Sequence, residues 1–342
     1  MESKISILVI YTGGTIGMIK DPETGMLLPY NFELLSKHIP EINNFDCDID
    51  SYSFDPPIDS SNMKPDLWVK LATVIEEFYE NYNGFVVLHG SDTMSFTASA
   101  LSFMLENLNK PVIFTGSQLP IGISRTDGKE NFITSIEIAA AQENDLPIVP
   151  EVCIYFENQL YRANRTHKYN AENFKAFSSL NYPVLAEAGV YIKYNKNAIH
   201  KPNFKRLRVH KNLDTNIVIL KLFPGIQENA VNSILNIEGL RAVILETYGS
   251  GNAPTDQWFI DTLSKAIKKG IIIVNVTQCK GGAVELGKYQ TSLNLNKIGI
   301  ISGHDITSES AIVKTMLLLG NNFSEQKLRK SLQTSIRGEI TV

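Results

Sequence analysis

Cysteine is scarce in this sequence: the 342 residues contain only Cys47, Cys153 and Cys279. The count is odd and the three positions lie far apart, so they fit neither a disulfide framework nor a cysteine-rich metal site. Unpaired cysteines are typical of proteins from a reducing compartment. The sequence therefore predicts a cytoplasmic protein without disulfide bonds.

Long hydrophobic runs and a basic leader are also missing. No apolar run approaches the roughly 20 residues that a membrane-spanning helix needs. The N-terminal segment "MESKISILVIYTGG" (1–14) has no basic start, and its short apolar run ends in glycines, so it does not resemble a signal peptide. We expect no membrane partner and, again, a cytoplasmic location.

A strong net charge is absent as well. The chain has 32 lysines and arginines and 36 aspartates and glutamates, a net charge of −4, with a pI of about 5.9. We therefore expect no nucleic acid as a partner. One local exception is the run from His200 to Lys211, which holds five lysines or arginines. It could be a strip that contacts RNA or a solvated linker, and the acidic remainder of the chain favours the linker.

Motifs for metals, phosphates and common nucleophiles are missing too. The six histidines show no H-E-x-x-H or other metal spacing. The glycines of "TGGTIG" (12–17) do not fit G-x-G-x-x-G, no G-K-[ST] follows, and no G-x-S-x-G occurs. An S-x-x-K match inside "DSSNMKP" (59–65) lacks its companion motifs and is discarded. We expect neither a metal nor a cofactor.

What the sequence does contain is an alternation of short apolar runs with helical patterns. The runs predict strands at 4–11, 85–88, 111–115, 151–156, 216–222, 241–246 and 271–276. Apolar residues at helical spacing predict helices near 66–82, 94–107, 128–143, 226–235, 256–268 and 307–319. Strands that alternate with helices form βαβ units around a mostly parallel sheet, so the expected fold class is α/β.

The chain is long enough for two domains. The stretch 193–216 is polar, basic and without periodicity, and it interrupts the alternation of strands and helices. We therefore expect a larger N-terminal α/β domain over 1–190, a linker over 191–214 and a smaller C-terminal α/β domain over 215–342.

The stretch "YTGGTIGM" (11–18) ends the first predicted strand in a glycine-lined turn that presents Thr15. Open α/β sheets bind ligands at the carboxyl ends of their strands, and adjacent glycines let a ligand approach the backbone closely. The turn is therefore either an ordinary strand end or the place where the Thr15 hydroxyl meets a substrate.

Two further segments follow predicted strands. In "HGSD" (89–92), Ser91 and Asp92 are ordinary helix caps, but the same helix N-terminus would also suit a substrate carboxylate. In "RANRTHKYN" (162–170), Lys168 is either a solvated surface residue or, if it is buried, a base for a hydroxyl.

Six segments resemble the bacterial-type L-asparaginase family, in the family's order and over almost the whole chain: "YTGGTIGM", "DSSNM", "HGSDTMSFTASALSFMLENL", "KPVIFTGSQLP", "NRTHK" and "LETYGSGNAP". The absence of a leader and the "TASALSFMLENL" helix resemble the cytoplasmic (type I) branch. The resemblance implies a flavodoxin-like N-terminal domain, a linker and a smaller α/β domain. It also implies hydrolysis of L-asparagine to L-aspartate and ammonia, in homodimers or homotetramers with sites at subunit junctions.

The resemblance gives each matching residue an expected role. Thr15 would be the nucleophile of a double displacement. Its catalytic partners would be Ser91, Asp92 and Lys168, with a serine where the family usually has threonine. The residues expected to bind the substrate are Asp59, Ser60, Ser61, Ser91 and Asp92, together with Asn252, which the partner subunit would lend to the site.

The group that deprotonates Thr15 departs from the family pattern. Many members supply a tyrosine from a lid, directly after a glycine, whereas here Met26 follows Gly25. A threonine hydroxyl is a poor nucleophile without a base. Either Tyr30 reaches the site from the lid, or the proton leaves through Lys168, Ser91 or a water.

Two other functions are weighed against asparagine hydrolysis. The same fold serves as the asparaginase-like subunit of a tRNA-dependent amidotransferase, which carries an additional domain before its glycine turn; here the turn begins at residue 12. A non-catalytic amino-acid-binding protein would need the pocket but neither nucleophile nor base. Glutamine is an alternative second substrate, because one methylene changes the fit to a pocket by only about 1–3 kcal/mol.

Some cytoplasmic members of the family bind asparagine at a second, activating site. In those members an arginine stands where this chain has Glu246, and a cysteine stands where it has Cys279. A glutamate would repel the effector's carboxylate, or it is simply a polar residue at a strand end. Both interpretations predict no activation by asparagine through this position.

Overall fold

The computed structural model describes residues 4–20, 27–29, 39–287, 290–321 and 323–341. The chain divides into two compact units, Met1–Lys211 and Asn212–Val342. The domain boundaries expected at 190 and 215 lie on either side of this division. Among the described residues, no helix has the length and apolar character needed to cross a membrane.

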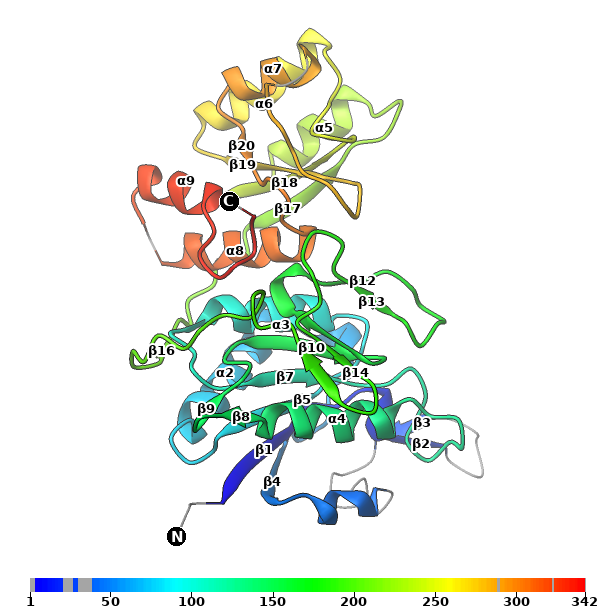
Figure 1. Ribbon diagram of the computed structural model, residues 1–342. Helices are drawn as coiled ribbons and strands as arrows, with labels where there is room; N and C mark the ends of the chain where they lie inside the picture. The colour runs from blue at the N-terminus through cyan, green and yellow to red at the C-terminus, as the bar shows by residue number, and fades with distance from the viewer. Residues whose placement is uncertain (1–3, 21–26, 30–38, 288–289, 322, 342) are drawn as a thin grey trace. The chain divides into compact units, whose positions relative to one another are not determined.

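The first unit is built on an eight-stranded sheet (Figure 1). In spatial order its strands are β15 (Ile192–Tyr194), β14 (Ala186–Ala188), β11 (Gln159–Arg162), β10 (Val152–Phe156), β7 (Val112–Thr115), β5 (Gly84–Leu88), β1 (Ile5–Tyr11) and β4 (Cys47–Ser53). The five strands from β10 to β4 run parallel. Numbered along the chain, these five have the order 2-1-3-4-5, which is the flavodoxin-like arrangement.

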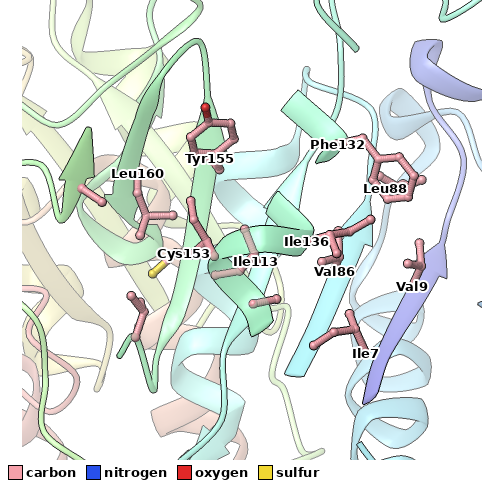
Figure 2. Packing of buried hydrophobic residues seen from close by; sticks show 14 of the residues in the cluster. Ile7, Val9, Val86, Leu88, Ile113, Phe132, Ile136, Cys153, Tyr155 and Leu160 are labelled. Atoms are coloured by element: carbon pink, nitrogen blue, oxygen red, sulfur yellow. The ribbon is translucent and has the colours of Figure 1, made fainter. Parts of the chain in front are cut away.

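Three helices of the described part of this unit cover the sheet: α2 (Pro65–Phe78), α3 (Met94–Met104) and α4 (Gly128–Ala140). Alternate strand residues point to opposite faces, and on one face they pack against Phe132 and Ile136 of α4 (Figure 2). Helices α2 and α3 lie on the other side of the sheet from α4 (Figure 1). Because both faces are covered, the strands are continuous apolar runs, and this is why the sequence revealed them.

The second unit has a four-stranded, all-parallel sheet. Its strands, in spatial order, are β17 (Ile217–Lys221), β18 (Ala242–Thr247), β19 (Ile272–Thr277) and β20 (Ile301–Ser302). Its helices are α5 (Glu228–Leu235), α6 (Gln257–Lys268), α7 (Gln290–Lys297), α8 (Ser308–Gly320) and α9 (Glu325–Gln333). The α/β fold with a larger and a smaller unit is therefore confirmed.

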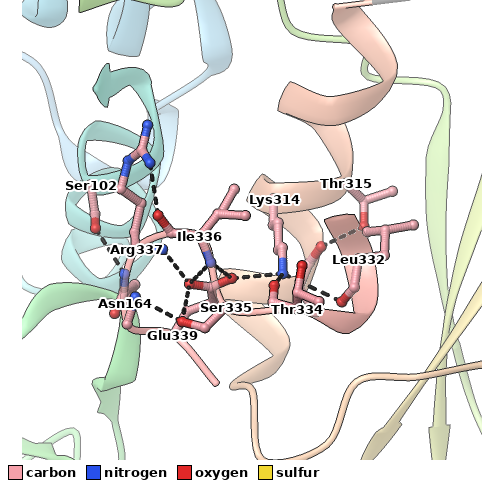
Figure 3. A network of polar contacts seen from close by, with 12 residues as sticks. Ser102, Asn164, Lys314, Thr315, Leu332, Thr334, Ser335, Ile336, Arg337 and Glu339 are labelled. Atoms are coloured by element: carbon pink, nitrogen blue, oxygen red, sulfur yellow. Dashed lines mark hydrogen bonds and ion pairs between the residues drawn. The ribbon is translucent and has the colours of Figure 1, made fainter. Parts of the chain in front are cut away.

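An ion pair buried within the second unit anchors the end of the chain (Figure 3). Lys314 Nζ lies 2.6 Å from Glu339 Oε1, and both side chains are almost fully buried. Lys314 also donates to the carbonyl of Thr334, and Glu339 accepts from the backbone N–H of Ile336. Burial lowers the pKa of Lys314; although burial alone would raise that of Glu339, the Lys314 ammonium and the backbone N–H groups hold the Glu339 pKa below its ordinary value.

The segment expected to be a linker is largely attached to the first unit. Strand β15 belongs to the large sheet, and β16 (Arg208–Val209) pairs with β6 (Leu105–Glu106). Two side chains of the basic run are held by carboxylates, because Glu106 lies 2.6 Å from His210 and Glu76 lies 2.6 Å from Lys211. The run is thus tethered at its end, although it carries no helix.

Candidate active site

The carboxyl ends of β1, β5 and β4 lie side by side, and the loops that follow them touch. Both Gly13 and Gly14 have positive φ angles, of 130° and 95°. A Cβ atom on Gly13 would lie 2.2 Å from the carbonyl oxygen of Ile58, and one on Gly14 would lie 2.4 Å from the backbone nitrogen of Gly90. These approaches require glycine. The glycine turn therefore brings the loops 12–15, 54–62 and 89–93 together.

Thr15 opens a single 3-10 turn, Thr15–Gly17, that follows the two glycines. The turn is held by the Tyr11 hydroxyl, which donates to the carbonyl of Gly17 at 3.1 Å. Among the described residues, none forms a hydrogen bond with the Thr15 hydroxyl. Thr15 therefore directly follows the glycines at which the three loops meet, and no described side chain is bonded to its hydroxyl as a base.

Ser91, Asp92 and Lys168 form one cluster. Lys168 Nζ lies 2.7 Å from Ser91 Oγ and 2.8 Å from Asp92 Oδ1. The Lys168 side chain is 15% exposed and that of Asp92 is 69% exposed, while Ser91 is buried. Lys168 comes from the short strand β12 (His167–Lys168), which pairs with β13 (Phe177–Ser178). It is therefore a partly buried lysine with defined partners, and the alternative of a solvated surface lysine is excluded.

The expected substrate-binding residues 59–61 lie in the loop after β4. The carboxylate of Asp59 caps a short 3-10 helix, because its Oδ1 accepts from both the backbone N–H and the hydroxyl of Ser61 at 2.8 Å. These two hydrogen bonds lower the pKa of Asp59. Ser60 is buried, and its carbonyl accepts from the Thr93 hydroxyl at 2.7 Å. The loop thus carries a charged carboxylate and is bound to the same segment that holds Ser91.

His89 precedes this segment and is fully buried. Its Nδ1 lies 2.7 Å from the carbonyl oxygen of Gly90, and its Nε2 has no hydrogen-bond partner among the described residues. Burial lowers the pKa of His89 to about 4, despite that hydrogen bond. The imidazole is therefore neutral near pH 7, with Nδ1 as the donor, and it supports the loop instead of exchanging protons with a substrate.

Gln118 is a neighbour of the cluster that the sequence analysis missed. Its Oε1 lies 3.3 Å from Ser91 Oγ, and its Nε2 donates to the carbonyls of Ala171 and Asn173 at 3.2 and 3.0 Å. It stands just beyond the end of β7, in "TGSQLP". The rule that pointed to Thr15 and Ser91, polar residues at the carboxyl ends of parallel strands, applies equally to Gln118.

The remaining expected residues are Asn252 and the lid residue Tyr30. Asn252 lies in the second unit, in a tight loop where its backbone N–H donates to the carbonyl of Tyr248 at 2.8 Å. Tyr30 and Met26 lie outside the described residues. Among the residues that are described, no group of histidine, cysteine, aspartate or glutamate side chains could hold a metal ion.

Comparisons with known proteins cover both units. Residues 6–200 match the family model "Asparaginase, N-terminal", and residues 216–332 match "Glutaminase/Asparaginase C-terminal domain". The chain is 41% identical to L-asparaginase 1 of Escherichia coli (strain K12) over 343 residues, 99% of this chain and 98% of that protein. It is 31% identical to a subunit of the glutamyl-tRNA(Gln) amidotransferase of Pyrococcus abyssi, over 98% of this chain and 76% of that protein. The crystal structure of L-asparaginase I from Vibrio cholerae superposes with a TM-score of 0.89 at 38% identity, covering 99% of this chain and all of the other.

Proposed function

The chain belongs to the asparaginase family, and on this premise we propose that it is an L-asparaginase, which hydrolyses L-asparagine to L-aspartate and ammonia. The observation that carries the proposal is the cluster in which Lys168 Nζ lies 2.7 Å from Ser91 and 2.8 Å from Asp92. A hydroxyl, an amine and a carboxylate in direct contact can move protons, which a protein that only binds an amino acid would not need. Thr15 stands on the neighbouring loop, where Gly14 meets Gly90.

The proposed reaction is a double displacement. The Thr15 hydroxyl attacks the side-chain amide carbon of asparagine, its proton passes to the leaving nitrogen, and ammonia departs. A water then attacks the β-aspartyl ester on Thr15 and releases aspartate, which restores the hydroxyl. Ser91, Asp92 and Lys168 are proposed to carry the protons in these steps. Backbone N–H groups near Thr15 and Ser91 are proposed to stabilise the oxyanion, and one such donor typically contributes about 3–4 kcal/mol.

We propose that the ends of the substrate are bound by the loop after β4 and by the start of the loop after β5. The Asp59 carboxylate, whose pKa is lowered by two hydrogen bonds from Ser61, is charged and suits the α-ammonium group. The second oxygen of that carboxylate makes no hydrogen bond with the described residues. The hydroxyl group of Ser60 suits the α-carboxylate. Ser61 acts through Asp59, to which it donates its backbone N–H and its hydroxyl, and Asp92 adds a second anion for the ammonium group.

For the base that deprotonates Thr15 we propose the same alternatives as before: either Tyr30 from the lid, or a path through Lys168, Ser91 or a water. The cluster supports the second path, because Lys168 is already bonded to Ser91. A lysine that loses its proton can accept one from a hydroxyl.

The chain's assembly and location are proposals of the same kind. We propose a homodimer or homotetramer in which Asn252 of the partner subunit completes the site. We propose a cytoplasmic location, which the chemistry of the cysteines supports: Cys47 and Cys153 are buried free thiols, and Cys279 is an exposed one. Burial raises the pKa of Cys47 and Cys153, which lowers the share of the reactive thiolate at both.

Ammonia release from asparagine and from glutamine by the purified protein, over a range of concentrations, tests the function. We expect turnover of asparagine. Absence of ammonia with both amides would favour a binding protein. Ammonia release that depends on added tRNA would favour an amidotransferase subunit instead.

A further inference from the structure

Gln118 connects the catalytic cluster to a loop on the far side of the site. The loop, residues 169–175, joins β12 to β13 and directly follows Lys168. It is internally braced, because the side-chain oxygen of Asn170 accepts from the backbone N–H groups of Glu172 and Asn173 at 2.8 Å. The backbone of Gln118 is fixed as well, since its N–H donates to the carboxylate of Asp127 at about 3 Å. Only the Gln118 side chain links the loop directly to Ser91 among the hydrogen bonds of the described residues.

The loop determines which end of the Gln118 amide faces Ser91. The two partners on the loop, the carbonyls of Ala171 and Asn173, can only accept hydrogen bonds, so the amide nitrogen must point to them. The amide oxygen is therefore the atom that faces Ser91 Oγ, at 3.3 Å. An amide oxygen can only accept, which makes Ser91 the donor of this contact.

The hydroxyl of Ser91 has a single proton, and its position follows from the two neighbours. Lys168, when protonated, can only donate, so the 2.7 Å contact with Ser91 Oγ places an N–H on the oxygen of the serine. The hydroxyl proton is left for Gln118. At 3.3 Å this bond is longer than the usual 2.5–3.0 Å of an O–H···O bond, so the hydroxyl can rotate away from it at little cost.

We propose that Gln118 is a positioning residue for asparagine hydrolysis, which holds the Ser91 hydroxyl in its resting orientation and ties that orientation to the 169–175 loop. This inference rests on the proposed function. When Lys168 has given a proton to the departing ammonia, the Ser91 hydroxyl turns from Gln118 to the free amine. Ser91 then takes a proton from the attacking water and passes its own to Lys168. One O–H bond breaks at the attacking oxygen, one breaks and one forms at Ser91, and the proton ends on the lysine nitrogen.

Two substitutions test the acceptor oxygen and the N–H donors of the Gln118 amide separately. Gln118→Met removes both the acceptor and the donors at similar volume, whereas Gln118→Glu keeps an acceptor oxygen and loses the donors to the loop. For Gln118→Met we expect kcat to fall about tenfold, a part of the 10²–10⁴ that a positioned acid–base group contributes, with KM changed less than about twofold. For Gln118→Glu we expect a smaller loss: kcat should fall by no more than about threefold, which is half of the tenfold loss on a logarithmic scale. Gln142→Met, at an exposed glutamine of β8 (Gln142–Glu143), is the matched control and should behave as the wild type.

Ammonia release by the wild type is measured first, and the rates of the variants are compared with it. If the wild type releases no ammonia, the proposed function fails before Gln118 is tested. If the wild type is active and Gln118→Met is near normal, the positioning role is overturned. The role is also overturned if Gln118→Glu is as slow as Gln118→Met, because Gln118 would then only anchor the loop, or if the loss lies in KM. Thermal unfolding of each variant shows whether a lost activity is a lost fold.

Discussion

Lys168 Nζ lies 2.7 Å from Ser91 Oγ, although 77 positions separate the two residues in the chain. The serine follows the end of a central parallel strand, and the lysine comes from a short antiparallel pair outside the large sheet. A contact over this separation brings two distant segments of the chain into one site.

Thr15→Val removes the proposed nucleophile while nearly preserving side-chain volume. We expect asparagine hydrolysis at or below about a thousandth of the wild-type rate, as for the loss of a covalent nucleophile. The fold should survive, because no described residue bonds the hydroxyl. Steady-state ammonia release and thermal unfolding measure both. Turnover above a tenth of normal would remove Thr15 from the mechanism.

Lys168→Met leaves Ser91 and Asp92 without their shared cation. We expect most of the activity to be lost, about a hundredfold or more, which is the usual scale of a general acid–base group. Ser91→Thr keeps the hydroxyl and should be tolerated, which makes it the matched control. Near-normal kcat in the Lys168 variant would show that the proton path lies elsewhere.

Tyr30→Phe tests the lid alternative. If Tyr30 is the base for Thr15, the loss of its hydroxyl should lower kcat about a hundredfold. We expect the smaller result, a change below about threefold, because Tyr30 stands four residues beyond the position of the family's lid tyrosine. A hundredfold loss of kcat would instead identify Tyr30 as the base that takes the Thr15 proton.

Asparagine should not activate the enzyme through Glu246. The carboxylate of Glu246 accepts from the Ser308 hydroxyl at 2.7 Å and lies 3.6 Å from Lys221 Nζ, and its side chain is only 12% exposed. A partly buried anion with these partners repels the carboxylate of an effector. We expect a hyperbolic rate curve with a Hill coefficient near one. A sigmoidal curve that flattens when Cys279 is made bulky would show an activating site that works without an arginine.

His89 should make the protein less stable as the pH falls below neutrality. Its pKa is lowered from 6.5 to about 4 in the folded chain, so between these values the unfolded chain binds more protons and stability rises with pH. The loss from pH 7 to pH 5 is about 2 kcal/mol in the free energy of unfolding. His89→Asn keeps a donor for the Gly90 carbonyl and does not titrate. Urea unfolding at both pH values should therefore show a smaller loss in this variant, and an equal loss in both proteins would contradict the prediction.

The sequence by itself determined the central architecture. All seven predicted strands are present within one residue at each end, because strands covered on both faces by helices must be apolar along their whole length. It also determined that Thr15 and Ser91 share an edge of the sheet, since the carboxyl ends of parallel strands meet there. Strand β4 was not predicted, because "CDIDSYS" lies at the edge of the sheet, exposes four of its seven residues and is therefore not a continuous apolar run.

Only the tertiary structure decided which side chains touch. The antiparallel strands β11, β14 and β15 extend the sheet, and they depend on turns such as Glu157–Asn158, where both residues have positive φ. In the sequence, Lys168 could not be distinguished from a lysine in a polar loop. Its burial comes from the pairing of β12 with β13, which the local periodicity of the sequence does not predict. The orientation of the Gln118 amide depends on two loop carbonyls more than 50 positions away. Hydrogen bonds between such distant groups depend on how the segments pack against each other. Local patterns in the sequence do not predict that packing.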